Sequence, residues 1–390
     1  GLSVQISALS WILSAVYHLE LDQIGIVWAA GPIAGIIAQP IVGLVSDKLW
    51  FLGGRRRPWI VLGGLLTGFM LLALPNLGIL QEMLGVGEHG LLTLAVIVAL
   101  TLDLSINVSF NPTRSLVADC TNKNQRSKGY TWMQTVSGTC GVLAYLVAVI
   151  WGNITLIYVG VCVALLFTLL PIFFIQEPRH LGEAEDNSES KSNGTSFKEI
   201  NNAILPLYGF LVYGIYVIVS KLAGFTDASQ VNLGICTLSG VEFACCLIEL
   251  IALVLVLGNV MKVDSNTNDF QKVLLAHSFT WWGVQTMNIY MFFYVSTVIT
   301  GLNTESMQAT NSWAFLVRDL VGAILPVLVL NKVAEKIGMN LTHTISILLM
   351  AAGYAAIYFW GSAIILFFCA LCIVGIGWAS LVSLPFAIMS

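Results

Sequence analysis

A carboxylate, two carboxamides and a guanidinium interrupt one long apolar segment of this 390-residue chain. They belong to Asp103, Asn107, Asn111 and Arg114, in the stretch LDLSINVSFNPTRSLVAD at 102–119. Successive residues of an α-helix are rotated by about 100°, so the four side chains would point within an arc of roughly 80°. Such a stripe offers paired donors and acceptors for the hydroxyls of a polar solute. The spacing therefore predicts that Asp103, Asn107 and Asn111 bind substrate.

The composition of the chain places this stripe in a membrane. Hydrophobic residues make up 57% of the chain and charged residues only 10%, whereas a soluble domain has about 25% charged residues. The expected fold class is an all-α polytopic membrane protein. Because a charge at the bilayer centre costs at least about 2.5–3.5 kcal/mol, the stripe must face a cavity or a partner helix instead of lipid.

Asp103 and Arg114 could act on the two sides of one ligand or water path. They would lie about 16 Å apart along a helix axis, which is too far for a salt bridge. A carboxylate shielded from water binds a proton more readily than one in solvent. Asp103 could thus bind and release a proton as its access alternates between the two sides of the membrane. The alternative is a buried polar seam that only holds helices together.

Apolar runs recur along the chain at the length that crosses a bilayer, about 20 residues. Twelve such runs lie near 1–19, 25–46, 58–80, 90–118, 130–151, 153–175, 203–222, 233–260, 271–299, 310–331, 341–360 and 362–389. Lys and Arg gather in alternate loops, which the positive-inside rule makes cytoplasmic together with the N-terminus. We expect an inner or plasma membrane protein. The short first run and the missing polar tail suggest that both ends are truncated.

The polar segment 176–202 divides the chain. It is rich in Ser, Asn, Glu and Lys, which predicts a solvated cytoplasmic linker. It follows an N-terminal six-helix lobe at 1–175 and precedes an accessory transmembrane hairpin at 203–260. A C-terminal lobe at 261–390 would show four helices and be incomplete. Two helical lobes joined by a linker are typical of transporters that hold substrate at the midplane.

The loop GLVSDKLWFLGGRRRP at 43–58 carries a recognisable motif. It resembles the cytoplasmic G-x-x-x-D-(R/K)-x-G-R-(R/K) loop of the major facilitator superfamily, with a few residues inserted before the arginines. The resemblance implies a gate in which Gly43 permits close helix approach and Asp47 caps a helix or pairs with a guanidinium. The arginines would anchor at anionic headgroups; they are Arg55, Arg56 and Arg57. A merely basic loop is the alternative.

Within that superfamily the chain resembles the sucrose- and maltose-type proton symporters of the glycoside–pentoside–hexuronide group. The resemblance rests on GPIAGIIAQPIVGLVSDK with GGRRRPW, on LDLSINVSFNPTRSLVAD, on HSFTWWGVQTMNIYMFFYV and on GIGWASLVSLPFAIMS. It does not cover 203–260, which twelve-helix members lack. The family's fourth-helix Asp and the Arg eleven residues later match Asp103 and Arg114. This implies that the two residues couple sugar and proton movement.

The coupling ion is expected to be H⁺, with no other cofactor. Sodium-coupled relatives use additional acids in the second helix, and the run at 25–46 contains none. Because a hard cation needs several oxygen ligands, Na⁺ is the less favoured ion. The cysteines lack the spacing of a metal site, so no metal is expected.

Further residues could complete the site. Amides bind hydroxyls and aromatic rings cover the C–H face of a sugar, although interfacial or core aromatics are an equally good account of each Trp. The candidates for substrate binding are Trp132, Gln134, Trp281, Trp282, Gln285 and Asn288. The intramembrane charges without an assigned role are Arg318, Asp319, Glu242 and Glu249. The first two could pair locally or take part in coupling. The two glutamates lie on one helix face, where we expect a structural or inter-lobe role, with a second proton site as the alternative.

The sequence predicts a secondary active transporter that moves a disaccharide or glucoside with protons by alternating access. Its partners would be the sugar and the lipid bilayer, with no nucleic acid, and the functional unit a monomer. A non-transporting sugar sensor on the same scaffold, or a symporter of a different small polar solute, is the alternative. The sequence contains no HExxH motif and no apparent Ser/His/Asp set near an interface, so an enzyme is not expected.

Overall fold

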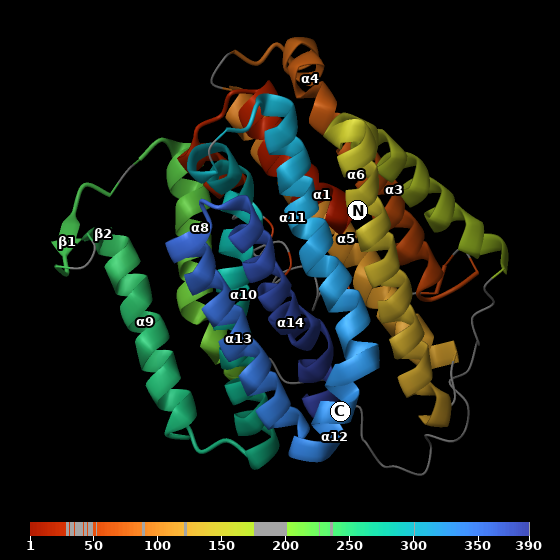
Figure 1. Cartoon of the computed structure of the whole chain (residues 1–390), viewed down its shortest axis with the longest axis vertical. Helices are drawn as coiled ribbons and strands as arrows, with labels where there is room; N and C mark the ends of the chain where they lie inside the picture. Colours follow the sequence, from red (N-terminus) through yellow and green to blue (C-terminus); the bar gives the residue numbers. More distant parts are fainter. Residues whose placement is uncertain are drawn as a thin grey trace. The chain divides into compact units, whose positions relative to one another are not determined.

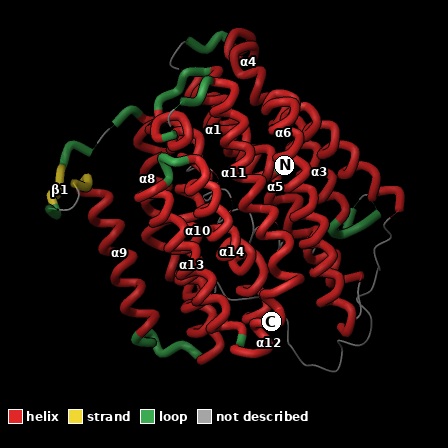
Figure 2. Tube along the Cα trace, in the orientation of Figure 1, coloured by secondary structure: helices red, strands yellow, loops and turns green. Residues whose placement is uncertain are grey.

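The computed structural model describes the chain except residues 29–30, 32–34, 36–41, 43–44, 46–49, 52, 88–89, 121–122, 175–200, 226, 235–236, 300 and 390. Helices make up nearly all of this described part, with one short pair of strands (Figure 2). The expected all-α class is confirmed. Gly43 and Asp47 of the gate motif, and most of the expected linker, lie outside the described residues. The chain forms two compact units, 1–179 with 286–390 and 180–285.

The first unit is built from helices of both halves of the chain (Figure 1). Its elements are α1 (Leu2–Trp11), η1 (Ile12–Val16), α3 (Arg57–Ala73), η2 (Leu74–Asn76), α4 (Leu77–Leu84), α5 (Gly90–Cys120), α6 (Lys123–Phe174), α11 (Thr304–Leu325), η5 (Pro326–Leu330), α12 (Asn331–Ile337), α13 (Met339–Trp360) and α14 (Ile364–Met389). It also contains residues 286–298 of α10 (Ser265–Val298).

Six helices among the described residues are long and apolar enough to cross a membrane, or seven if the bent pair Glu305–Leu325 and Leu328–Ile337 is one span. The pair is bent by 41° at η5, which begins with Pro326 and has π-helical geometry. Proline removes a backbone donor and breaks the regular ladder. The expected number of twelve spans remains a prediction, since the second of them falls mostly outside the described residues.

Helix α6 turns back on itself at Gly152. That residue has φ 82° and ψ 167°, a conformation that glycine adopts at little cost. A Cβ built at Gly141 would lie 3.3 Å from Ser3 Oγ, and one at Gly160 would lie 2.7 Å from Val4 Cγ2. Residues nineteen apart could not meet the same turn of α1 on a straight helix, where they would be about 28 Å apart. The two arms visible in Figure 1 therefore agree with separate runs at 130–151 and 153–175.

Small residues set the distance between neighbouring helices of this unit. A Cβ at Gly63 of α3 would lie 2.6 Å from the backbone of both Ser105 and Ser109 of α5. The hydroxyls of Thr67 and Ser105 are 2.9 Å apart across the same contact. Small residues that permit close backbone approach, with hydroxyls bridging the helices, are typical of packing in membranes.

The second unit is a helical hairpin followed by the first part of α10. Its elements are η4 (Leu205–Leu207), α8 (Tyr208–Ala223), β1 (Gln230–Asn232), β2 (Thr237–Ser239) and α9 (Gly240–Leu257). The strands pair in antiparallel fashion, with Val231 opposite Leu238. Ser239 and Glu242 form a capping box at the start of α9, which satisfies two backbone donors at once. Glu242 also accepts a hydrogen bond from Tyr213 at 3.2 Å, which gives it a structural role here.

Candidate functional site

The Asp103 carboxylate faces other helices of the first unit. Gln5 of α1 donates a hydrogen bond from Nε2 to Asp103 Oδ2 at 3.1 Å. A Cβ at Gly31, in the second apolar run, would lie 2.6 Å from the same oxygen. The glycine lets that segment come close to the carboxylate. Asp103 is only partly buried, whereas the Gln5 side chain is 1% exposed.

The other described side chains of the polar stripe lie along α5 and contact groups other than the Asp103 carboxylate. Asn107 Nδ2 donates to the backbone oxygen of Asp103 at 2.8 Å, within the helix. The Arg114 guanidinium lies over the Phe110 ring, 4.3 Å from its centre, which favours a cation–π contact. The side chain of Asn111 lies outside the described residues. Asp103 and Arg114 remain well separated along α5, as the spacing predicts.

Buried hydroxyls and amides connect α1 to helices from both halves of the chain. Ser7 Oγ donates to Asn153 Oδ1 of α6 at 3.1 Å and lies 3.4 Å from Ser312 Oγ of α11. Ser10 Oγ donates to the backbone oxygen of Ile289 of α10 at 2.9 Å. This polar face was not predicted. Its signal is the four polar residues of the apolar stretch GLSVQISALSW, namely Ser3, Gln5, Ser7 and Ser10.

A second charged cluster surrounds Arg318 of α11, whose side chain is 1% exposed. Its Nε donates to Asp319 Oδ1 at 2.8 Å and its Nη1 donates to Asn288 Oδ1 of α10 at 2.7 Å. The guanidinium also lies 4.5 Å from the centre of the Trp378 ring. The structure thus contains the local ion pair that adjacency suggested, and adds Asn288 to it.

Several buried polar atoms of the first unit have no hydrogen-bond partner among the residues that the structure describes. Four of them belong to α1, α11 and α13: Gln5 Oε1, Asn311 Oδ1, Arg318 Nη2 and Tyr354 Oη. The charge of Arg318 interacts with the hydroxyls of Tyr145 and Tyr354, so these three side chains lie near one another. More than about 90% of buried polar groups in proteins are hydrogen-bonded. The four atoms therefore call for a polar ligand or water. Tyr145 and Tyr354, beside Arg318, were not predicted from the sequence.

Asp103 and Asp319 lie against different sides of α1. A Cβ at Gly141 of α6 would be 3.3 Å from Ser3 Oγ and 3.5 Å from Asp319 Oδ2, which places Asp319 near Ser3. Asp103 bonds to Gln5. Residues two apart on a helix are rotated by about 200°. The structure therefore does not unite Asp103 and Asp319 in one site.

Several of the residues predicted to bind substrate belong to the second unit and make contacts within that unit. Trp281 Nε1 donates to His277 Nε2 at 2.7 Å, one turn earlier on α10. Trp282 is 59% exposed and its ring meets Phe210 edge-on, with centres 5.8 Å apart. Gln285 is partly buried. The side chains of Trp132 and Gln134 lie outside the described residues. A substrate-binding role for all of these remains a prediction.

The remaining charged candidates make local contacts. Glu249 Oε2 accepts the backbone N–H of Gly209, near the start of α8, at 3.1 Å. Arg56 is buried, and Arg57 Nη1 is 3.5 Å from the backbone oxygen of Gly53. Among the described residues, no group of three or more His, Cys, Asp or Glu side chains could hold a metal ion.

Comparisons with known proteins point to one family. The family model described as Major Facilitator Superfamily matches residues 1–390. The general alpha-glucoside permease of Schizosaccharomyces pombe is 34% identical over 134 residues, 33% of this chain and 24% of the permease. The sucrose transport protein SUC3 of Arabidopsis thaliana is 34% identical over 111 residues, 26% of this chain and 19% of that protein. The proton-associated sugar transporter A of Homo sapiens is 32% identical over 131 residues, 32% of this chain and 17% of that protein. The matched segments thus span about a quarter or less of each relative.

Proposed function

Since the chain belongs to the major facilitator superfamily, we propose that it transports a disaccharide or α-glucoside in symport with protons. It is a multi-pass integral membrane protein and not an enzyme. Relatives at 31–34% identity are named as sucrose transport proteins and as an alpha-glucoside permease, which supports the substrate class. The distribution of Lys and Arg supports a cytoplasmic membrane with the N-terminus inside.

The observation that carries the proposal is the set of unpartnered buried polar atoms. They come from α1 in the first half of the chain and from α11 and α13 in the second half. A sugar provides several hydroxyls, each of which can donate and accept. Such a ligand can satisfy the Tyr354 hydroxyl and the unpartnered nitrogen of Arg318 together. Substrate at the contact between the two halves is what alternating access requires.

Asp103 supplies the coupling step in this proposal. An ionised carboxylate accepts hydrogen bonds from Gln5 and from a sugar hydroxyl, but its charge makes movement through the bilayer costly, by at least about 2.5–3.5 kcal/mol. Protonation removes that charge and lets the loaded protein change its access. Release of the proton on the other side would restore the charge of Asp103. The sugar-loaded protein would then return to its first conformation less readily. Arg114 lies on the same helix, with its guanidinium over the Phe110 ring.

Uptake into proteoliposomes tests the proposal. The purified full chain is reconstituted, and radiolabelled sucrose and maltose are supplied with and without an inward proton gradient, with sorbitol as the control solute. We expect accumulation of one of the two disaccharides above its external concentration only when the gradient is present. Binding without uptake would instead indicate a sensor, and equal uptake without a gradient would contradict proton coupling.

A further inference from the structure

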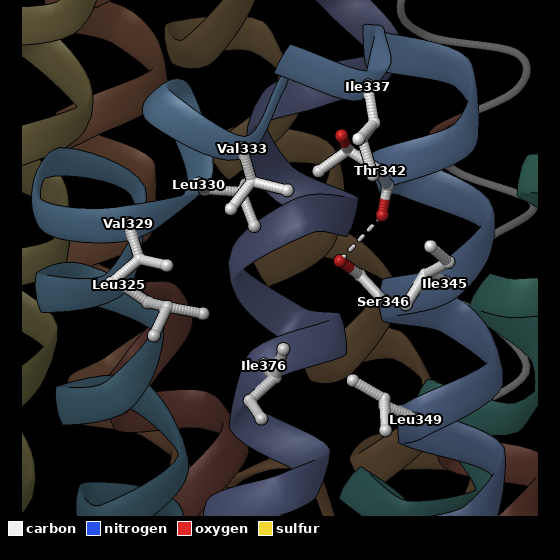
Figure 3. A pocket seen from close by; sticks show the side chains of 10 residues that line it. All are labelled: Leu325, Val329, Leu330, Val333, Ile337, Thr342, Ile345, Ser346, Leu349 and Ile376. Atoms are coloured by element: carbon white, nitrogen blue, oxygen red, sulfur yellow. Dashed lines mark hydrogen bonds between the residues drawn. The ribbon is translucent and has the colours of Figure 1, made fainter. Parts of the chain in front are cut away.

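An apolar pocket lies among the end of α11, η5, α12, α13 and α14. It encloses about 210 Å³. Figure 3 shows the side chains that line it: Leu325, Val329, Leu330, Val333, Ile337, Thr342, Ile345, Ser346, Leu349 and Ile376. Pockets for drug-sized molecules occupy about 300–1,000 Å³ and place polar groups toward the ligand. The small size and the lining of this pocket do not suit a disaccharide.

The two hydroxyls in the wall are already used. Thr342 Oγ1 donates to the backbone oxygen of Gly338 at 2.7 Å, and Ser346 Oγ donates to that of Thr342 at 2.8 Å (Figure 3). Such back-bonding leaves no free O–H donor for a ligand. The wall is therefore effectively apolar along α13 from Thr342 to Leu349, a length of about 10 Å. That is two thirds of the hydrocarbon half-thickness of a bilayer, which is about 15 Å.

Positive charge lies beside one end of the pocket. Lys332 and Lys336 of α12 directly precede the lining residues Val333 and Ile337. Both lysines are exposed, and neither is in a salt bridge with any described residue. Glu335 lies between them, so α12 keeps a net positive charge of one. The helix directly precedes the candidate span Met339–Trp360, so we expect its lysines near the level of the lipid headgroups.

We infer that this pocket takes one acyl chain of an anionic phospholipid, whose headgroup is held by Lys332 and Lys336. An acyl chain suits an apolar slot within the membrane, and a basic helix at its mouth selects a negative headgroup. Lysines near a membrane surface attract anionic lipid by about 1 kcal/mol each, or roughly fivefold in affinity. This inference is independent of the sugar and the proton.

Native mass spectrometry of the full chain in detergent tests the inference, with phosphatidylglycerol and phosphatidylcholine as probes. Wild type should retain phosphatidylglycerol in preference to phosphatidylcholine. The double variant Lys332→Gln/Lys336→Gln should lose roughly 25-fold in affinity for phosphatidylglycerol, whereas Lys332→Arg/Lys336→Arg should keep it. These exposed residues can be changed without disturbing the core. Equal retention of the two lipids by wild type would overturn the inference.

A second pair of variants locates the acyl chain. Ser346→Trp fills the pocket and should abolish retention of phosphatidylglycerol. Leu348→Trp, on the 65% exposed face of the same helix, should leave it unchanged. If Ser346→Trp elutes as a folded monomer and still retains the lipid as well as Leu348→Trp does, the lipid binds elsewhere and the inference is wrong.

Discussion

Asp103 depends on a residue 98 positions earlier in the chain. The Gln5 amide is almost fully buried, and it donates to Asp103 while its own oxygen lacks a partner among the described residues. We interpret Gln5 as the residue that positions the carboxylate between helices. The remaining acceptor on Gln5 is then available to a polar ligand beside Asp103.

Replacement of Gln5 should impair transport specifically. Gln5→Leu keeps the volume but removes the donor to Asp103 and the free acceptor. A hydrogen bond to a charged group contributes about 1.5–3 kcal/mol, so we expect gradient-driven uptake to fall roughly tenfold to a hundredfold. The matched variant Gln81→Leu, on the exposed part of α4, should transport normally. Initial rates in proteoliposomes measure both; normal uptake by Gln5→Leu would exclude the positioning role.

The Arg318 cluster makes a prediction about stability. Arg318→Gln leaves the partly buried Asp319 without its ion-pair partner, and breaking a buried pair costs about 3–5 kcal/mol. The double variant Arg318→Gln/Asp319→Asn removes the stranded charge and should recover much of that loss. Thermal unfolding in detergent compares the two with wild type. If the double variant unfolds as early as the single one, the pair is not what stabilises this region.

The sequence was informative about residues that break its apolar pattern and silent about their partners. Asp103, Asn288 and Arg318 are conspicuous because a charge or amide inside a span is costly. Tyr145 and Tyr354 are not, since an aromatic in a span is unremarkable until its hydroxyl is seen to be buried. The pairing of Gln5 with Asp103 depends on how two distant helices are rotated and shifted, which one sequence does not specify.

At the level of helices, the contact between α3 and α5 should be sensitive to a single methyl group. A Cβ at Gly63 would lie 2.6 Å from backbone atoms that cannot move aside. Gly63→Ala should therefore lower stability by about 1–3 kcal/mol. Gly78→Ala in α4 meets nothing within 4 Å and should be neutral or stabilising by up to about 1 kcal/mol. The midpoints of thermal unfolding of the two variants in detergent measure this difference. Equal midpoints would contradict the close contact between α3 and α5.

The stability of the connection between α8 and α9 should depend on pH. The hydroxyl and the backbone N–H of Ser229, and the N–H of Val241, donate to Asp227 and lower the pKa of its carboxyl. A carboxyl with a lowered pKa stabilises the folded form above its unfolded pKa of about 3.9, and that stabilisation is lost as the pH falls through the lowered value. Hydrogen exchange at Val241 should show protection at neutral pH that declines in acid.

Asp227→Asn is the control for that experiment. It keeps the shape and one acceptor but cannot titrate, so protection of Val241, corrected for the intrinsic exchange rate, should be weaker at neutral pH and independent of pH. Acid-induced loss of protection in Asp227→Asn equal to that in wild type would assign the effect to another group.

Helix boundaries were largely predictable, for physical reasons. The reversal at Gly152 follows a glycine between two apolar runs, where a positive φ is inexpensive. The capping box of α9 lies in the run expected at 233–260, yet the short strands ahead of it were not expected. Glu242 lies in the first turn of α9, which begins at Gly240, and its place as an intramembrane charge stays a prediction.

Across the whole molecule, α1 has the central position in the first unit. It bonds to α5 and α6 from the first half of the chain and reaches α10 and α11 from the second. Asp103 and the Arg318–Asp319 pair lie against different sides of it. A shift of α1 would therefore change the surroundings of both acids together, which gives a route from protonation to a change of access.

The most direct test of the account is made with Asp103→Asn in proteoliposomes. The amide keeps the shape of the carboxylate and its contact with Gln5 but cannot exchange a proton. We predict that it loses sugar accumulation driven by a proton gradient and keeps exchange of labelled for unlabelled sugar at equal pH, which needs no net proton movement. Full gradient-driven accumulation by Asp103→Asn would contradict the account.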